Sequence, residues 1–331
     1  MSSISTRREF MVKATATAAG AAVCASPASA LLSEPDQPRS RVAIGRDEAL
    51  TQGALAEHRD LLCKLLDASM QRLTDADNPT AAWRTLFAPT DRVGIKVNTL
   101  GLSTRPVVVD AIVRGLVSGG VPAENVLVWD RFDVELSAAG FKINRSARGV
   151  QCRGTDAEQM GSGYERNIET SGQIGSCFSQ IVARDVDKLI CVPVLKDHNL
   201  AGVSLGMKNF YGAIHNPNKY HDRNCDPYIA DVVSHRYIRG KWCLTVCDAT
   251  RAQVHAGPGR HPGYAWPFGG LIVGKDVVAV DAVASDLLEA ERKARGLKSL
   301  AEEKRPSTHI ATAAARGLGV ADLNRIQRIE V

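Results

Sequence analysis

The feature that most constrains the fold is an alternation of short apolar runs with helical segments through residues 92–331. The runs lie at residues 92–98, 125–129, 149–152, 187–194, 241–247, 269–273 and 323–331. Segments with helix caps or helical spacing fall at residues 106–117, 133–141, 226–238, 276–290 and 308–316. This alternation predicts an α/β fold, a mostly parallel sheet with helices on both faces. Residues 167–179 have no clear period and predict a loop.

The first 90 residues do not follow this alternation. Apolar residues recur at helical spacing between residues 46 and 73, and a second short helix is predicted at residues 80–87. We therefore predict a helical extension over residues 46–90. Residues 31–45 predict a linker, and the α/β domain is expected to occupy residues 91–331.

The N-terminus resembles a twin-arginine export signal over residues 1–30. Arg7 and Arg8 precede a weakly hydrophobic stretch at residues 14–25, and Ala-Ser-Ala at residues 28–30 has the pattern that signal peptidase cleaves. The resemblance implies that the twin-arginine translocase carries the folded protein to the periplasm. The hydrophobic stretch is too short and too rich in alanine for a membrane helix, so no stable membrane span is expected.

The net charge gives little indication of a polyanionic partner. It is +5 over 331 residues, and residues 1–30 contribute Arg7, Arg8 and Lys13 against Glu9. The remaining excess of +3 is small for a chain of this length. No nucleic-acid partner is therefore expected.

Polar side chains follow the ends of three predicted strands. These are Lys96 and Asn98 at the end of the first strand, Lys196 and His198 after the strand at residues 187–194, and Asp248 after the strand at residues 241–247. Residues two apart in extended chain point to the same side. Open parallel sheets bind ligands at the carboxyl ends of their strands. We therefore expect these side chains to converge on one crevice.

The segment at residues 192–227 adds more candidates, and it holds three of the eight histidines. Glycines flank Lys208 and Asn209, a spacing that allows backbone N–H groups to face an anion but that is also common in plain packing. The spacing matches neither a nucleotide P-loop nor the dinucleotide fingerprint.

These observations predict a site for a small anionic molecule. The predicted catalytic residues are Lys196, His198 and Asp248, with His198 as the proton-transfer group. The predicted ligand-binding residues are Lys96, Asn98, Lys208 and Asn209, because lysines can hold a carboxylate or phosphate. The alternative is that each lysine is an ordinary solvated strand end.

A second polar cluster predicts a metal site as one hypothesis. His215, His221 and Cys225 have the ligand types that zinc, copper or iron accept. The alternative is a hydrogen-bonded loop that covers the crevice. The spacing is neither that of a zinc finger nor that of a ferredoxin, so the identity of any cofactor stays open. An aromatic loop at residues 254–270, near the strand end at Asp248, is either a lid or a plain surface loop.

The order of these residues resembles the landmarks of the bacterial domain-of-unknown-function family numbered 362. The resemblance covers about residues 93–288. Its most specific part is Leu195-Lys196-Asp197-His198 followed by Lys208-Asn209-Phe210-Tyr211-Gly212, and it also includes Asp248, Lys275-Asp276 and Asp281. The biochemistry of the family is largely unassigned, so the resemblance implies architecture more than activity. Some members carry an inserted ferredoxin-like segment with closely spaced cysteines. This chain lacks that insertion.

Three hypotheses of function follow. The first is an exported enzyme, a cofactor-dependent oxidoreductase or an acid–base enzyme, that acts on a small anion. The second is a non-catalytic periplasmic protein that binds a ligand or a metal in the same pocket. The third is an assembly partner of an exported complex, which predicts a large exposed apolar patch in place of a polar crevice.

Overall fold

The structure, a computed structural model of the chain, describes residues 40–156 and 163–331. At its centre is a mixed sheet in which parallel strands stand in the order β4-β3-β2-β7-β10. Strand β12 continues the sheet antiparallel to β10, and β1 and β13 follow it. The prediction of an α/β fold is confirmed: the sheet is mostly parallel and packs against helices.

The strands have the following bounds. The parallel set comprises β2 (Val93–Val97), β3 (Val126–Phe132), β4 (Gln151–Asp156), β7 (Lys188–Val192) and β10 (Trp242–Gln253). The far edge comprises β12 (Gly270–Gly274), β1 (Ser40–Arg46) and β13 (Ile326–Glu330). Short strands β8 (Val194–His198), β9 (Gly202–Val203) and β11 (Ala265–Trp266) join it beside β10, and β5 (Glu169–Ser171) and β6 (Ile174–Ser176) form a separate hairpin.

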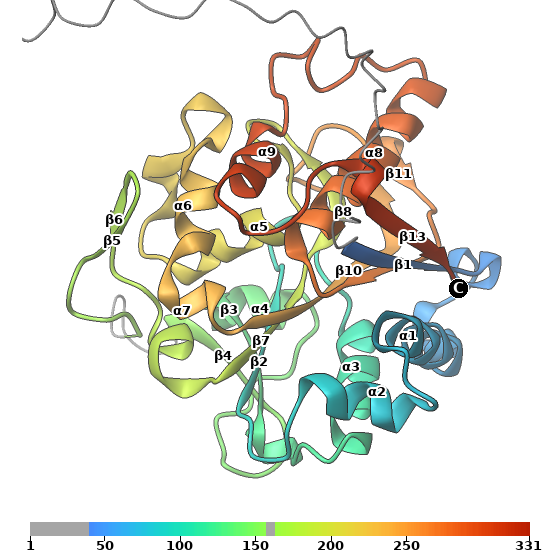
Figure 1. The fold of residues 1–331 in the computed structure, drawn as a ribbon, viewed down its shortest axis with the longest axis vertical. Helices are drawn as coiled ribbons and strands as arrows, with labels where there is room; N and C mark the ends of the chain where they lie inside the picture. The colour runs from blue at the N-terminus through green and yellow to red at the C-terminus, as the bar shows by residue number, and fades with distance from the viewer. Residues whose placement is uncertain (1–39, 157–162) are drawn as a thin grey trace, which may run out of the picture. The chain divides into compact units, whose positions relative to one another are not determined.

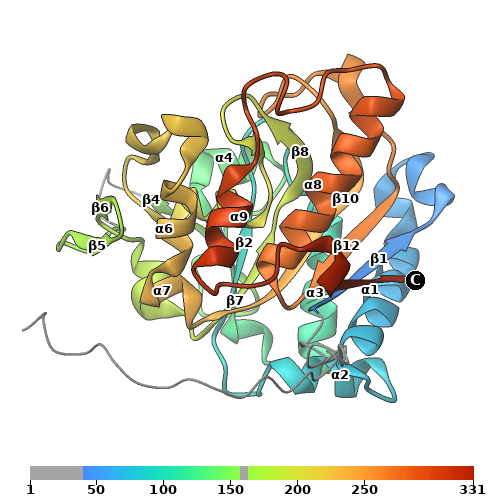
Figure 2. The same ribbon diagram turned by 45° about the horizontal axis from the view of Figure 1, so that its top comes forward.

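Helices cover both faces of the sheet (Figures 1 and 2). One group comprises α1 (Arg59–Thr74), α2 (Pro79–Leu86), α3 (Pro106–Ser118) and α4 (Asp133–Ala138). The other comprises α5 (Gly206–Asn209), α6 (Tyr228–Ser234), α7 (Arg236–Arg239), α8 (Val277–Ala294) and α9 (Thr308–Ala315). Along β7 the side chains alternate between these layers: Leu189 and Cys191 pack in the second core, and Ile190 and Val192 in the first.

The strand order places a topological switch point between β2 and β7. The chain proceeds from β2 to β3 and β4 on one side, and then returns to the other side of β2 as β7. Loops that leave the carboxyl ends of β2 and β7 therefore turn away from each other. In open parallel sheets this divergence creates a crevice for ligands.

The structure corrects several boundaries predicted from the sequence. Residues 40–45, assigned above to a linker, belong to strand β1 because Val42, Ala43 and Ile44 are buried in the sheet. Regular helix in the N-terminal extension begins only at Arg59, after two short 3₁₀ turns, and α1 packs against β1 and α3 in one compact unit with the rest. The loop predicted at residues 167–179 contains the β5-β6 hairpin.

Two predictions concern residues that the structure does not describe. The export signal at residues 1–30 and most of the predicted linker lie outside the described residues. Across residues 40–156 and 163–331, every helix is too short or too polar to cross a membrane.

Candidate functional site

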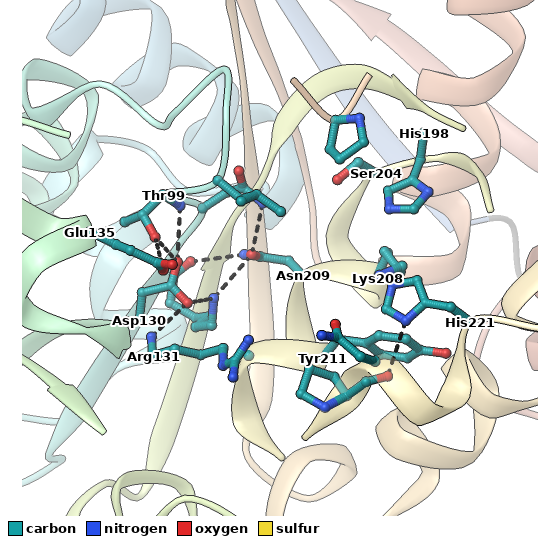
Figure 3. A pocket seen from close by; sticks show the side chains of 17 residues that line it. Thr99, Asp130, Arg131, Glu135, His198, Ser204, Lys208, Asn209, Tyr211 and His221 are labelled. Carbon is teal, nitrogen blue, oxygen red and sulfur yellow. Dashed lines mark hydrogen bonds and ion pairs between the residues drawn. The ribbon is translucent and has the colours of Figure 1, made fainter. Parts of the chain in front are cut away.

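A pocket of about 120 Å³ lies at the switch point, over the carboxyl ends of β2 and β3. Figure 3 shows Thr99, Asp130 and Glu135 on one side of it and His198, Lys208 and His221 on the other, with Asn209 between them. The two groups come from opposite directions. The loop after β2, the end of β3 and α4 form the first wall, and the end of β8, α5 and the segment that follows α5 form the second. The expected convergence at the strand ends therefore takes the form of a two-sided pocket.

The centre of the pocket is a buried ion pair. The Lys96 Nζ lies 2.7 Å from Oδ1 of Asp130, and it also donates to the Val97 carbonyl and to Oδ1 of Asn209 at 3.1 Å. Both members of the pair are almost fully buried. A Cβ at Gly212 would lie 2.7 Å from Cε of Lys96 and 2.8 Å from Oδ1 of Asp130, so only glycine leaves room for this pair.

One hydroxyl joins two carboxylates on the first wall. Oγ1 of Thr99 lies 2.9 Å from Oδ2 of Asp130 and 3.1 Å from Oε2 of Glu135. A hydroxyl has one proton to donate, so it satisfies only one of these oxygens. Asp130 also accepts from the backbone N–H groups of Thr99 and Arg131, whereas the structure gives the Glu135 carboxylate no other hydrogen bond within the described residues.

Lys208 is the dominant group of the second wall. Its side chain is buried, its Nζ lies 3.1 Å from Nε2 of His221, and the same atom lies 3.9 Å from the centre of the Tyr211 ring. Burial lowers the pKa of Lys208 to about 8, against an opposing effect of Cys225. Within residues 40–156 and 163–331, no carboxylate forms an ion pair with this ammonium.

The fold places Lys208 through a buried carboxylate on another helix. Asp281, on α8, accepts from the backbone N–H groups of Gly206 (2.8 Å) and Met207 (2.9 Å) at the start of α5. Burial raises the pKa of Asp281 to about 7, although these two hydrogen bonds oppose the shift. Asp281 therefore fixes the short helix that carries Lys208 and Asn209.

Hydrogen bonds determine the tautomers of the two pocket histidines. Nδ1 of His198 accepts from the backbone N–H groups of Leu200 (3.1 Å) and Ala201 (3.2 Å), so the ring proton is on Nε2. Burial, with Lys208 adding to it, lowers the pKa of His198 to about 2 and that of His221 below its usual range. His198 is therefore a neutral donor, while His221 donates from Nδ1 to the Pro217 carbonyl and accepts from Lys208 at Nε2.

Arg131 is a pocket residue that the sequence reasoning missed. It follows Asp130 at the end of β3 and lines the pocket, and its buried Nε has no hydrogen-bond partner in the part of the chain described. Thr99 and Glu135 were missed as well. The sequence did contain an indication of this wall: the predicted strand at residues 125–129 runs into Asp130 and Arg131, at the same edge of the sheet as Lys96.

Comparison with known protein families matches residues 93–286 to the family described as Domain of unknown function (DUF362). The chain belongs to this family. The matched region covers more than half of the chain and contains both walls of the pocket. No curated protein and no solved structure matches the chain.

Within this DUF362 domain, Lys96, Asn98, His198, Lys208 and Asn209 of the predicted site line the pocket. Asn98 donates to Oδ1 of Asn209 at 3.5 Å and accepts from Lys196 at 2.9 Å. A polar chain thus runs from the Lys96 ion pair through the two asparagines to Lys196. These residues are the part of the predicted site that the fold brings together.

Two residues predicted to be catalytic, Lys196 and Asp248, lie outside the lining of the pocket. Lys196 is fully buried. Its ammonium donates to Oδ1 of Asn98, to the Leu100 carbonyl and, at 2.9 Å, to the Leu102 carbonyl, so all three of its protons are used. Burial lowers its pKa to about 7, against the opposing charge of Asp130. These hydrogen bonds make Lys196 a structural residue that holds the loop after β2 in place. Because Lys196 is buried, the alternative that it is an ordinary solvated lysine at a strand end is also excluded.

Asp248, like Lys196, is buried and uses its polar atoms to hold neighbouring parts of the chain together. Its Oδ2 accepts from the backbone N–H of Arg105 (2.9 Å) at the start of α3, and its Oδ1 accepts from Thr250. The carboxylate therefore ties β10 to the helix that follows the loop after β2.

The three predicted metal ligands do not form one cluster. His215 is exposed and packs its ring edge against Tyr164, both nitrogens of His221 are used as described above, and the Cys225 Sγ lies 3.9 Å from the His221 carbonyl. Burial raises the pKa of the Cys225 thiol. Among the described residues, no group of three or more histidine, cysteine, aspartate or glutamate side chains is arranged to hold a metal ion.

The aromatic loop at residues 254–270 reaches the pocket through Pro258. The N–H of Gly257 donates to Oδ1 of Asp197 at 2.8 Å, and the Gly257 carbonyl accepts from the Asn199 N–H at 3.0 Å. The loop is thus anchored on both sides of His198, next to the mouth of the pocket.

Proposed function

We propose that the pocket binds a small anionic molecule and that Lys208 is its principal anion-binding group. One observation carries the proposal: the ammonium of Lys208 is buried in the pocket without a carboxylate partner among the described residues. A buried charge requires compensation, and the neutral ring of His221 is the only hydrogen-bond acceptor that the described residues offer this ammonium. An anion in the pocket supplies the missing charge.

Two further groups support an anion at this position. Nε2 of His198 carries a proton and faces the pocket, and the Arg131 guanidinium lines the opposite wall. A neutral imidazole N–H and a guanidinium both donate to carboxylate or phosphate oxygens.

The same arrangement suits acid–base catalysis on the bound molecule. A lysine with a pKa of about 8 exists in both protonation states close to neutral pH, and catalytic acids and bases work best in that range. Lys208 takes the proton-transfer role that the sequence analysis assigned to His198. A non-catalytic binding protein is the alternative. Exchange of ligand C–H protons for deuterium in D₂O, lost in Lys208→Arg, distinguishes the enzyme from the binding protein.

Calorimetry with propanoate, inorganic phosphate and sulfate tests the binding proposal. We expect at least one of these anions to bind the wild type, and Lys208→Met to weaken its binding at least about tenfold. The matched control is Lys64→Met, at an exposed position of α1, which should bind like the wild type. The proposal fails if none of the three anions binds, or if Lys208→Met binds them as well as the wild type.

We also propose export to the periplasm, on the basis of Arg7, Arg8 and the Ala-Ser-Ala at residues 28–30. The test is cell fractionation of the full chain and its Arg7→Lys, Arg8→Lys double variant. We expect the wild type in the periplasm with residues 1–30 removed, and the double variant in the cytoplasm. An equal distribution of the two would contradict the proposal.

A further inference from the structure

We propose that the natural ligand is a small monoanion that also carries a hydroxyl group, which donates a hydrogen bond to Glu135. This inference rests on the proposed anion site and names the chemistry of the ligand's other end. The pocket has two chemically different walls, with Lys208 and His198 on one side and Asp130 and Glu135 on the other (Figure 3). A ligand that fills the pocket meets both.

Glu135 has unused acceptor capacity. The Thr99 hydroxyl is shared with Asp130, and no second donor to the Glu135 carboxylate exists within the described part of the chain. Glu135 is half-buried, so a ligand that covers its carboxylate displaces water from it, and a ligand without a donor makes no hydrogen bond in return. The geometry therefore selects for a ligand with an O–H or N–H at this end.

His198 provides an independent observation that the pocket is built for a ligand. Its side chain is 5% exposed, and its protonated Nε2 has no hydrogen-bond partner in the described residues. This nitrogen belongs to a side chain that lines the pocket, so it is available to donate to a ligand there. His198 lies on the same wall as Lys208, so it would donate to the anionic end of the ligand and not to the hydroxyl end.

The charge of the lining decides between a hydroxyl and an ammonium group. By formal charge, three basic side chains (Lys96, Arg131 and Lys208) and two acidic ones (Asp130 and Glu135) line the pocket, and burial keeps both histidines neutral. The lining thus carries one excess positive charge. A hydroxylated monoanion balances it, whereas an amino acid, which has no net charge, does not.

The volume of the pocket restricts the size of this ligand. One water needs about 10–15 Å³ of such space, so the pocket of about 120 Å³ accepts a molecule of about ten non-hydrogen atoms or fewer. A short hydroxy acid fits this limit.

A series of three-carbon acids tests the inference by calorimetry at pH 7. The probes are propanoate, 2-hydroxypropanoate, 3-hydroxypropanoate, alanine and β-alanine. They share a three-carbon carboxylate and differ only in whether carbon 2 or carbon 3 carries a hydrogen, a hydroxyl or an ammonium group. We expect one hydroxy acid to bind the wild type at least about tenfold more tightly than propanoate, and more tightly than either amino acid. In Glu135→Gln the advantage over propanoate should shrink to about threefold or less. The matched control, Glu124→Gln at an exposed position, should retain the advantage.

The outcomes separate this inference from the proposed function. If propanoate binds through Lys208 but the hydroxy acids bind no better, the role of Glu135 is wrong and the anion site stands. If an amino acid binds best, the charge argument is wrong. If Glu135→Gln retains the full advantage, the hydroxyl is recognised elsewhere and the inference is overturned. If no anion binds the wild type at all, the proposed function itself fails. The wild-type series tests the inference even where a variant does not fold.

Discussion

Nζ of Lys208 lies 3.1 Å from Nε2 of His221, whose Nδ1 donates to the Pro217 carbonyl. A carbonyl only accepts, so the proton of the neutral ring is on Nδ1 and Nε2 is free to accept from the ammonium. His221 thereby orients Lys208 without neutralising its charge. The anion affinity of the pocket is therefore tied to the protonation state of one lysine.

Propanoate binding should weaken as the pH rises above about 8. The pKa of Lys208 is about 8, and propanoate keeps its single charge throughout this range. The free ammonium is lost as the pH passes the pKa, so we expect constant affinity between pH 6 and 7 and a fall approaching about tenfold per pH unit well above pH 8. Calorimetry from pH 6 to 10 measures this. Lys208→Arg, which stays charged, should show no such fall, and the same fall in this variant would assign the titration to another group.

Folding stability should decrease as the pH falls below about 6.5, partly because of two buried histidines. Burial lowers the pKa of His198 to about 2 and that of His309 to about 3, with Lys208 adding to both. The unfolded chain takes up protons near pH 6.5 while the folded chain does not. Each group therefore makes the free energy of unfolding fall by up to about 1.4 kcal/mol per pH unit below that pH.

The variant that tests this is His309→Leu, because both ring nitrogens of His309 are buried and have no hydrogen-bond partner among residues 40–156 and 163–331. Urea unfolding at pH 7, 6, 5 and 4 should show a shallower loss of stability in the variant, by about 1.4 kcal/mol per pH unit below pH 6. Parallel curves for the two proteins would mean that His309 is already protonated in the folded state.

Lys196→Met and Lys208→Met should separate a structural lysine from a binding lysine. Lys196 donates to three acceptors around the loop after β2, and its loss leaves them unsatisfied, so we expect a destabilisation of about 2–4 kcal/mol. Loss of Lys208 removes an uncompensated buried charge, so its variant should be at least as stable as the wild type. Urea unfolding measures both. If Lys196→Met left the free energy of unfolding unchanged, the structural role assigned to Lys196 would be wrong.

Gly212→Ala should destabilise the protein by about 1–3 kcal/mol, since the new methyl overlaps the Lys96 and Asp130 side chains. The matched control is Gly263→Ala, where a Cβ meets nothing within 4 Å. That variant should stay within about 0.5 kcal/mol of the wild type. Equal stability of the two variants in thermal unfolding would show that the ion pair tolerates the methyl group.

Much of the site was predictable because strand ends in a parallel sheet share one edge. Lys96, Asn98 and His198 were expected there from their positions after apolar runs, and they line the pocket. Arg131 was missed, although the same rule applies to the strand that runs into Asp130. Glu135 lies beyond that strand on helix α4, where strand periodicity gives no information about which way a side chain faces.

The α/β class, the order of the elements along the chain and the edge at which polar groups gather could all be predicted from the residues, because apolar periodicity and strand polarity are local properties. The direction in which each polar group faces depends on contacts that the folded chain makes. Lys96 and Lys196 follow similar apolar runs, yet Lys196 lies on β8, which pairs with β10 through a register shift, and it points to the carbonyls of Leu100 and Leu102. Charge pairing was decided in the same way: Lys96 meets Asp130 from the neighbouring strand, whereas Lys208 meets the neutral imidazole of His221, and strand or helix periodicity predicts neither contact.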